Sequence, residues 1–465
     1  MLRLDLDDIQ GLIVRGYPEL PAARYVLLQI DDPAGGRRWL AGLASQVTPG
    51  STRPTGIALN VAVTANGLRK LGLPAQALRS FSNEFTTGMV TPHRRRILGD
   101  VGPNAPEQWL WGGPNTPAVD ILLLQFARDE STLDQHTFTG EGVSEITRLD
   151  ATISLDGKEH FGFADGISQP TIAGLSSRTD IPANTIKAGE FILGYVNEYG
   201  RYTARPLIDR SADPDHLLAS DAEGGGKADF GRNGSYVVFR HLAQDVRGFW
   251  HYLDEATRQP DGASDAHART RLAAKMVGRW PSGAPVTLTP DDDDPALATA
   301  NDFTYFYGDE FGLNCPIGAH VRRSHPRDSL DPSPGTEASV SLDRRHRLLR
   351  RGREYGQPVE DALGDAPADD PDRGLYFVAL AGNIARQFEF IQHTWVNNPT
   401  FNQLYDEPDP VVANHTAVGC NFSVPADPVR TRYTNLPNFV TIRGGAYFFL
   451  PGIRALKYLS TLEEG

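Results

Sequence analysis

One local pattern occurs in both halves of the 465-residue chain and restricts the folds that it can adopt. Residues 25–30 in the first half and residues 236–239 in the second are short apolar runs, and apolar residues at helical spacing follow each run. These residues are Trp39, Leu40, Leu43 and Val47 in the first half, and Val246, Phe249, Trp250 and Leu253 in the second. A short apolar run predicts a strand, and spacings of three or four predict a helix. We interpret the halves as degenerate copies of one strand–helix unit.

Each half continues with a further pattern of the same kind. Residues 57–63 alternate as in a half-buried strand, and residues 375–380 form an apolar run that leads into a second helical stripe. The alternating residues are Ile57, Leu59, Val61 and Val63, and the stripe contains Ile384, Phe388, Ile391 and Trp395. Strands and helices that alternate twice over predict an α+β protein of two sandwiches with antiparallel sheets.

The two predicted units are joined by irregular sequence. Residues 210–215 and residues 223–227 are rich in Asp, Pro and Gly, which are typical of loops. We therefore predict an N-terminal domain over residues 1–215 and a C-terminal domain over residues 216–465. A chain in which 40% of the residues are hydrophobic has enough apolar side chains for two cores.

Charge and hydropathy argue against two classes of partner. The net charge of −13 would repel a phosphate backbone, so nucleic acid is not an expected partner. No apolar run approaches the roughly 20 residues that cross a bilayer, and acids interrupt the apolar residues at the N-terminus. We expect no membrane association and predict a cytoplasmic location. Cys315 and Cys420 are the only cysteines and predict buried free thiols.

Two further stretches have simple interpretations. Residues 291–294 are four consecutive aspartates, whereas calcium loops place their carboxylates at alternate positions. We interpret this run as a solvated segment that caps a helix. Residues 331–341 contain Pro332, Pro334 and neighbouring polar residues, and they predict a surface insertion.

Three short segments carry residues that are suited to chemistry. Phe161-Gly162-Phe163-Ala164-Asp165-Gly166 contains an Asp-Gly pair, which by itself predicts a turn. Cys315-Pro316-Ile317-Gly318-Ala319-His320-Val321-Arg322-Arg323 and Leu348-Leu349-Arg350-Arg351-Gly352 follow it along the chain. In this order the three segments resemble the fingerprints of the dye-decolorizing peroxidase family. The resemblance continues through residues 231–236, 387–392 and 440–445 and so covers most of the chain.

The resemblance implies a fold, a cofactor and an activity. The fold would be two ferredoxin-like domains, with haem b held mainly by the C-terminal domain. The activity would be a haem-dependent peroxidase that reduces hydrogen peroxide and oxidises small organic donors, such as dyes and phenols, by one-electron steps. The alternative from a binding class is a haem-handling protein that stores haem or releases its iron, with incidental peroxidase activity. The natural donor and the oligomeric state are left open.

The resemblance also assigns the protein's ligand to the haem iron. His320 matches the family's axial histidine, and a neutral imidazole is the usual donor. His325 lies five residues on, which would rotate it by about 140° on a helix, so both rings could not face one iron. Glu389 is our candidate acceptor for the second ring nitrogen of His320, with an interdomain salt bridge as the alternative role. Arg322 or Arg323 is expected to pair with a haem propionate, the alternative being a solvated surface role.

The remaining site residues are expected on the open face of the haem. Asp165 would move a proton between the two peroxide oxygens, and Arg350 would stabilise the developing negative charge. Arg351 is the alternative arginine, because sequence does not show which of the two neighbours points inward. An unperturbed Asp has a pKa of about 3.9, well below that of His, and this predicts an enzyme that works best in acid.

Overall fold

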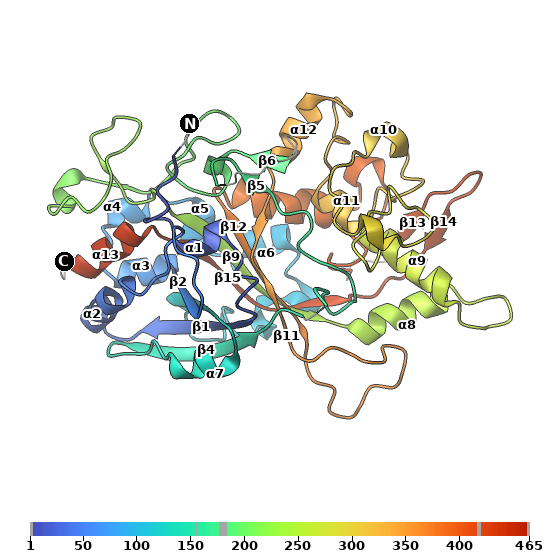
Figure 1. Ribbon diagram of the computed structural model, residues 1–465, viewed down its shortest axis with the longest axis horizontal. Helices are drawn as coiled ribbons and strands as arrows, with labels where there is room; N and C mark the ends of the chain where they lie inside the picture. Colours follow the sequence, from blue (N-terminus) through green and yellow to red (C-terminus); the bar gives the residue numbers. More distant parts are fainter. Residues whose placement is uncertain (1–2, 155, 176–183, 416–419, 463–465) are drawn as a thin grey trace.

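Two antiparallel sheets with the same strand order join at their edges in this computed structural model, which describes residues 3–154, 156–175, 184–415 and 420–462 (Figure 1). The first sheet contains β1 (Ala22–Ile30), β2 (Ile57–Val63), β3 (Ile121–Ala127) and β4 (Val143–Ala151), in the order β2-β3-β1-β4. Helix α2 (Pro33–Ala44) follows β1, and α7 (Glu130–Gln135) follows β3. This β-α-β-β-α-β succession is the ferredoxin-like arrangement.

The second sheet repeats the arrangement. It contains β9 (Ser235–Gln244), β12 (Gly374–Ala381) and β15 (Val440–Leu450), with the short strands β10 (Leu349–Arg350) and β11 (Arg353–Tyr355) on the outer edge of β12. Helix α8 (Val246–Ala256) follows β9, and the π-helical segments Ala385–Glu389 and Ile391–Val396 follow β12. The predicted repetition of a strand–helix unit and the two ferredoxin-like domains are thereby confirmed.

The sheets meet where β15 runs beside β2, with Phe449 opposite Val63. Both faces of the combined sheet are covered, and each face has a core to which both halves contribute. One core contains Val26, Val61 and Phe449, and the other contains Leu27 and Phe448, as the alternation of side chains along a strand requires. The domain boundary between residues 215 and 216 stays a prediction, and residues from both sides of it contribute to each core.

Strand β2 shows the effect of this second core. The sequence predicts a half-buried strand, but Ala58 and Ala62 on its other face are buried as well. The alternation over residues 57–63 therefore distinguishes large from small side chains, and the half-buried interpretation is wrong. The C-terminal helix α13 (Ile453–Thr461) follows β15 and packs on α2, so the end of the chain covers the first sheet.

The second half also carries a lobe of helices and loops beyond its sheet, on the right in Figure 1. The lobe includes α8, α9 (Ala266–Val277), α10 (Phe306–Asp309), α11 (His320–Ser324) and the hairpin of β13 (Phe422–Val424) and β14 (Thr431–Tyr433). Phe161 and Phe163 from the segment after β4 are buried in its core, with Phe161 packed on Phe249. The segment that carries Asp165 is thus anchored on the second half.

The remaining helices lie between strands. Four of them separate β2 from β3, namely α3 (Ala65–Lys70), α4 (Ala75–Leu78), α5 (Asn83–Thr87) and α6 (Pro92–Leu98). Short strand pairs close other loops, namely β5 (Thr171–Ile172) with β6 (Thr185–Ile186), and β7 (Leu207–Ile208) with β8 (Ala228–Asp229). Helix α1 (Gly11–Val14) lies near the N-terminus.

Three smaller predictions can be compared with the structure. Asp294 accepts a hydrogen bond from the Ala296 N–H and caps a short helical turn, as expected for the acidic run. Both cysteines are buried free thiols, also as expected. Residues 331–341 are not simply a surface insertion, because they include the start of α12 (Glu337–Arg344), on which Ser339 is fully buried and accepts the Leu330 N–H.

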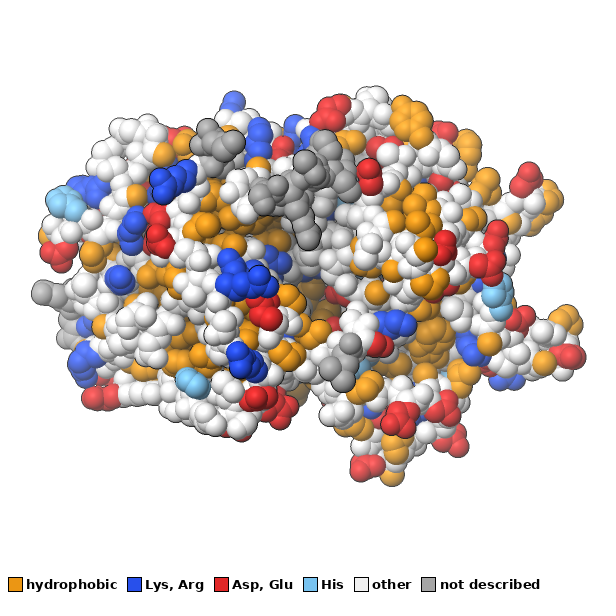
Figure 2. All heavy atoms as spheres, in the orientation of Figure 1, with side chains coloured by type: hydrophobic (Ala, Val, Ile, Leu, Met, Phe, Trp, Pro, Cys, Tyr) orange, Lys and Arg blue, Asp and Glu red, His pale blue; other side chains and the backbone are white. Residues whose placement is uncertain are grey.

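Basic and acidic side chains lie close to one another over the face of the molecule in Figure 2. Among the described residues, no helix has both the length and the apolarity needed to span a membrane.

Candidate active site

A cavity of about 300 Å³ lies between the segment around Asp165, the sheet of the second half and the helical lobe. Its walls are largely apolar and include Phe161, Phe163, Leu242, Val277, Leu375, Phe377, Phe388 and Ile391. The charged and imidazole side chains on its wall are Glu159, Asp165, Arg240, Arg279, His320, His325, Arg347 and Arg350. The cavity therefore brings three residues from the sequence prediction together, which are Asp165, His320 and Arg350.

His320 is the first residue of α11 and reaches the cavity from the helical lobe. Its Nδ1 lies 2.8 Å from Oδ2 of Asp409, a fully buried carboxylate. The other oxygen of Asp409 accepts the backbone N–H groups of Val411 and Val412, which holds the carboxylate in place. Burial tends to raise the pKa of Asp409, but the adjacent His320 ring lowers it to a net value below the usual range. With Nδ1 held by an anion, Nε2 is the ring nitrogen left to donate to a metal.

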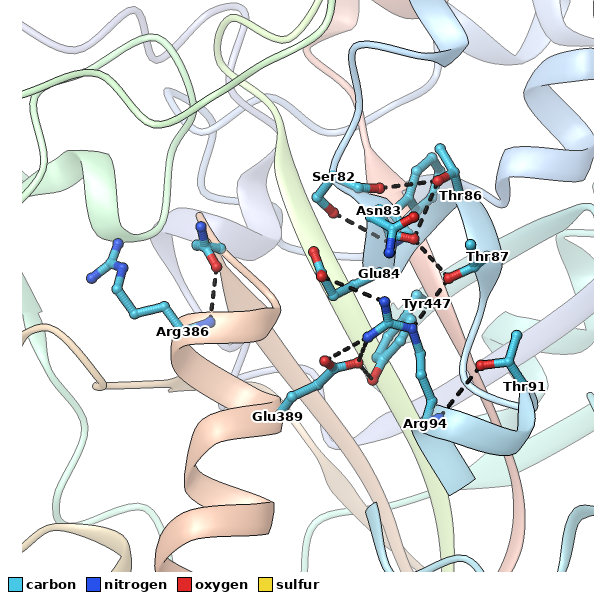
Figure 3. A network of polar contacts seen from close by, with 12 residues as sticks. Ser82, Asn83, Glu84, Thr86, Thr87, Thr91, Arg94, Arg386, Glu389 and Tyr447 are labelled. Carbon is cyan, nitrogen blue, oxygen red and sulfur yellow. Dashed lines mark hydrogen bonds and ion pairs between the residues drawn. The ribbon is translucent and has the colours of Figure 1, made fainter. Parts of the chain in front are cut away.

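The prediction that Glu389 accepts from His320 is wrong. The carboxylate of Glu389 binds the guanidinium of Arg94 at 2.6 Å and accepts a hydrogen bond from the Tyr447 hydroxyl at 2.9 Å (Figure 3). Phe388, its neighbour in the π-helical segment, lines the cavity, whereas Glu389 does not. Glu389 instead links the second half to α6 of the first, which is the interdomain salt bridge given as its alternative role.

Asp409 was missed because its sequence context gives no functional signal. It stands between Pro408 and Pro410 in a segment that reads as a turn, 89 residues after His320. Only the fold brings the two side chains together.

The predicted pairing of Arg322 or Arg323 with a haem propionate is also wrong. Both guanidinium groups are buried beneath α11 and neither lines the cavity. Arg322 binds Asp309 at 3.1 Å and the Cys315 carbonyl at 2.7 Å. Arg323 donates to carbonyl oxygens, including that of Gly318 at 3.1 Å. These two arginines satisfy buried carbonyls around the histidine helix, so the alternative of a solvated surface role is excluded as well.

Asp165 and Arg350 meet at the cavity wall, where Nη2 of Arg350 lies 3.0 Å from Oδ1 of Asp165. Their side chains are 48% and 31% exposed because they face the cavity. Arg351 points the other way and donates to the carbonyls of Leu12 and Ile13. Arg350 is the last residue of β10, and Arg351 follows it with its N–H still bonded to Val378 of β12, so the two side chains point to opposite faces of the extended chain.

The carboxyl of Asp165 has a lowered pKa at the cavity wall. Enclosure within the cavity, which the side chain faces, would by itself raise the pKa of its carboxyl, but the Arg350 guanidinium and the Gly166 N–H lower it, and the net pKa falls below the usual value. Asp165 therefore stays ionised to a lower pH than an isolated aspartate.

One part of the cavity wall is rich in buried donors. Arg347, 4% exposed, donates to the Ser168 carbonyl and to Asn184, each at 2.9 Å. Within the described chain, Nη1 of Arg347 has no hydrogen-bond partner, although it lies 3.9 Å from Oδ2 of Asp343, and Arg347 lines the cavity. Burial and the nearby Arg347 lower the pKa of His325 to about 3, so its ring is neutral, and its Nε2 faces Asp343 at 3.1 Å. A buried guanidinium N–H without a hydrogen-bond partner indicates that a ligand supplies an acceptor here.

Comparison with known proteins agrees with this geometry. The chain is 32% identical to a dye-decolorizing peroxidase of Exidia glandulosa, over 97% of this chain and 86% of the relative. It is 30% identical to the multifunctional dye peroxidase DyP2 of an Amycolatopsis strain, over 98% of this chain and 96% of the relative. No protein-family model matches the chain.

The chain belongs to the dye-decolorizing peroxidase family. Its fold is similar to the crystal structure of a decolorizing peroxidase from Auricularia auricula-judae, with a TM-score of 0.77, 27% identity, and coverage of 98% of this chain and all of the other. A dye-decolorizing peroxidase in complex with 2,6-dimethoxyphenol also has a TM-score of 0.77, at 27% identity and the same coverage. The protein is therefore a peroxidase, and its cofactor is haem.

Substitutions at Glu389 and Asp409 should have different effects on the haem. Asp409→Asn is expected to change the ferric absorption spectrum, because the ring of His320 loses its anionic acceptor. Glu389→Gln is expected to leave the spectrum unchanged, because Glu389 does not contact His320. Spectra of the two purified variants at equal haem loading test the assignment, which fails if Glu389→Gln gives the larger change.

Arg94→Met should affect stability and not the haem. It leaves Glu389 as a buried charge without its cation, which typically costs about 3–5 kcal/mol. Denaturant unfolding should show this decrease in the free energy of unfolding while the absorption spectrum stays that of the parent protein. A decrease below about 0.5 kcal/mol would show that Glu389 is solvated or neutral and that the pair is not a buried ion pair.

Proposed function

We propose that the cavity would hold haem b through a bond from Nε2 of His320 to the iron, and that Asp165 and Arg350 activate hydrogen peroxide. The observation that carries this proposal is that the His320–Asp409 pair and the Asp165–Arg350 pair face one apolar cavity. A nitrogen donor, an acid–base group and a fixed cation are the groups that a haem peroxidase requires.

The residues around the cavity fit haem at its face and at its edge. Apolar walls suit the porphyrin, and the carboxylate of Asp409 increases the basicity of the His320 imidazole as an iron ligand. Arg347 and Arg279 form the donor-rich part of the wall, and Nη1 of Arg347, which has no hydrogen-bond partner, suits a propionate. We assign the propionates to this part in place of Arg322 and Arg323.

The residues of the chain have separate tasks during peroxide reduction. Haem, when bound, supplies the electrons for reducing peroxide and regains them one at a time from organic donors. The ionised Asp165 accepts the proton from the inner oxygen of hydrogen peroxide and returns it to the outer oxygen, which leaves as water. The Arg350 guanidinium stabilises the negative charge that develops on the departing oxygen. The 3.0 Å contact between the two side chains keeps the base and the cation together.

Phenols and dyes are the proposed donors. The structure of a relative with 2,6-dimethoxyphenol and the names of the curated relatives support this class. Storage of haem or release of its iron is the second candidate function. Repeated turnover of 2,6-dimethoxyphenol with hydrogen peroxide, without loss of iron, distinguishes a peroxidase from a haem-handling protein. The cytoplasmic location remains a prediction.

His320→Ala is expected to abolish or greatly weaken haem retention. Haem content per protein after gel filtration measures the loss, and the ferric spectrum of any residual haem should lose its histidine character. His251→Ala is the matched control, because His251 is exposed on α8 and does not line the cavity. Full loading and an unchanged spectrum in His320→Ala would show that another residue binds the iron.

Asp165→Asn and Arg350→Leu should retain haem but react slowly with hydrogen peroxide. Loss of the acid–base group is expected to lower the rate constant about 10²–10⁴-fold, and loss of the charge stabiliser about 10²–10³-fold. Stopped-flow absorbance at several peroxide concentrations gives these rate constants. Arg351→Leu serves as the control, since Arg351 is bonded to backbone carbonyls away from the cavity, and a slow Arg351→Leu with a normal Arg350→Leu would reverse the assignment.

The lowered pKa of Asp165 gives the reaction with peroxide a pH dependence that differs from the acidic optimum expected from the sequence. Because the pKa of Asp165 is lowered, its ionised form persists below pH 3.9, so the rate constant should stay constant from neutrality into that range and decrease only at lower pH. Arg350→Leu removes a cation that favours ionisation, so the decrease should move to higher pH. The rate constant is measured by pH-jump stopped flow without any dye. A transition near pH 6.5 that is lost with a histidine would assign the proton transfer to an imidazole.

A further inference from the structure

Glu159 is a carboxylate on the cavity wall that has no role in the proposed mechanism. Its Oε1 accepts the Phe163 N–H at 3.0 Å, and its Oε2 accepts the Phe161 N–H at 2.9 Å. Oε2 also accepts the side-chain amide of Gln244 at 2.7 Å. All three neighbours are hydrogen-bond donors, so three N–H groups fix the position of the carboxylate.

Two of these donors belong to the loop that presents Asp165. The Gly162 N–H binds the Glu159 carbonyl at 2.7 Å, and Gly162 has a φ of +93°, so the backbone turns back on itself at this residue. The turn directs the N–H groups of Phe161 and Phe163 at the same carboxylate. Asp165 follows only two residues after Phe163, and its own backbone is held by a longer bond of 3.4 Å to the Gly157 carbonyl.

The third donor belongs to the sheet of the second half. Gln244 ends β9, where it lies opposite Val440 of β15, and its backbone N–H binds the Arg373 carbonyl at 2.9 Å. A residue paired on both sides within a sheet is a rigid point of attachment. Glu159 therefore connects the loop of Asp165 to the same sheet that carries Arg350.

We propose that Glu159 is a positioning residue whose carboxylate holds the loop of residues 159–166 on β9 and so places Asp165 beside Arg350 at the cavity. The inference rests on the role proposed above for Asp165. The contact of Asp165 with Arg350 is a single hydrogen bond between side chains that face the cavity, so the position of the backbone determines where the carboxylate lies.

A proton-transfer role for Glu159 makes a different prediction. Burial, together with the nearby charge of Asp165, raises the pKa of Glu159 to about 7. If Glu159 transferred the proton, the reaction of the parent protein with peroxide would change near pH 7, and Glu159→Gln would lose that change. If Glu159 only positions Asp165, the pH dependence of Glu159→Gln matches that of the parent protein.

Hydrogen exchange and peroxide kinetics on the haem-loaded protein test the proposal. In Glu159→Ala the amides of residues 159–166 should exchange faster, and the rate constant with peroxide should fall about 10²-fold, the effect of a displacement of about 1 Å. Glu159→Gln retains an acceptor for one N–H group and should show a smaller loss. The matched control is Asp213→Ala, since Asp213 accepts the N–H groups of Leu217 and Leu218 in a loop that does not line the cavity. Its faster exchange should be confined to that loop, with the peroxide reaction unchanged.

The outcomes separate this inference from the proposed function. A normal reaction in Asp165→Asn would contradict the role of Asp165 itself. A slow Asp165→Asn together with parent-like exchange and kinetics in Glu159→Ala would overturn only the positioning role. Equal losses in Glu159→Gln and Glu159→Ala, with unchanged exchange and loss of a transition near pH 7, would make Glu159 a proton-transfer group and also overturn it. If Glu159→Ala does not load haem, the exchange and kinetics of Glu159→Gln decide.

Discussion

The edge pairing of β15 with β2 is the constraint on which the rest of the structure depends, because it turns two ferredoxin-like sheets into one surface with two shared cores. With the edges joined, the apolar residues of both halves are buried together on each face. In the second half the long connections between strands form the helical lobe, and the cavity lies where that lobe, the sheet and the segment after β4 meet.

Much of the fold could be predicted from the sequence. The runs at residues 25–30 and 236–239 and their helical stripes correspond to β1 with α2 and to β9 with α8. These elements are set by local periodicity, which sequence displays directly. The junction of the two sheets could not be predicted, because pairing between strands distant in the chain leaves no local pattern. The burial of Ala58 and Ala62 was missed for the same reason, since it depends on a second core.

Some residues of the candidate site could also be predicted from the sequence, and others could not. Asp165, His320 and Arg350 were found because each stands in a distinctive segment, and the strand β10 explains why Arg350 and not Arg351 faces the cavity. Asp409 was not found, because its function depends on a contact across 89 residues between two prolines. Arg322 was misassigned because an arginine next to a ligand looks like a partner for a propionate, whereas here it binds the buried carboxylate of Asp309 and nearby carbonyls. Sequence identifies residue types suited to chemistry, and packing decides which of them turn inward.

The side chains on the two sides of the cavity are supported by different numbers of hydrogen bonds. Around His320, Asp409 accepts two backbone N–H groups as well as the ring, and the buried Arg323 donates to the carbonyls of Gly318, Trp395, Asn398 and Glu407. Asp165 accepts the N–H group of Gly166 and one hydrogen bond from Arg350 of β10, and Glu159 holds its loop on β9. A site residue is only as well placed as the groups that support it. Changes beneath His320 should therefore first disturb folding and haem retention, whereas changes around Asp165 can alter the rate of peroxide reduction while the fold persists.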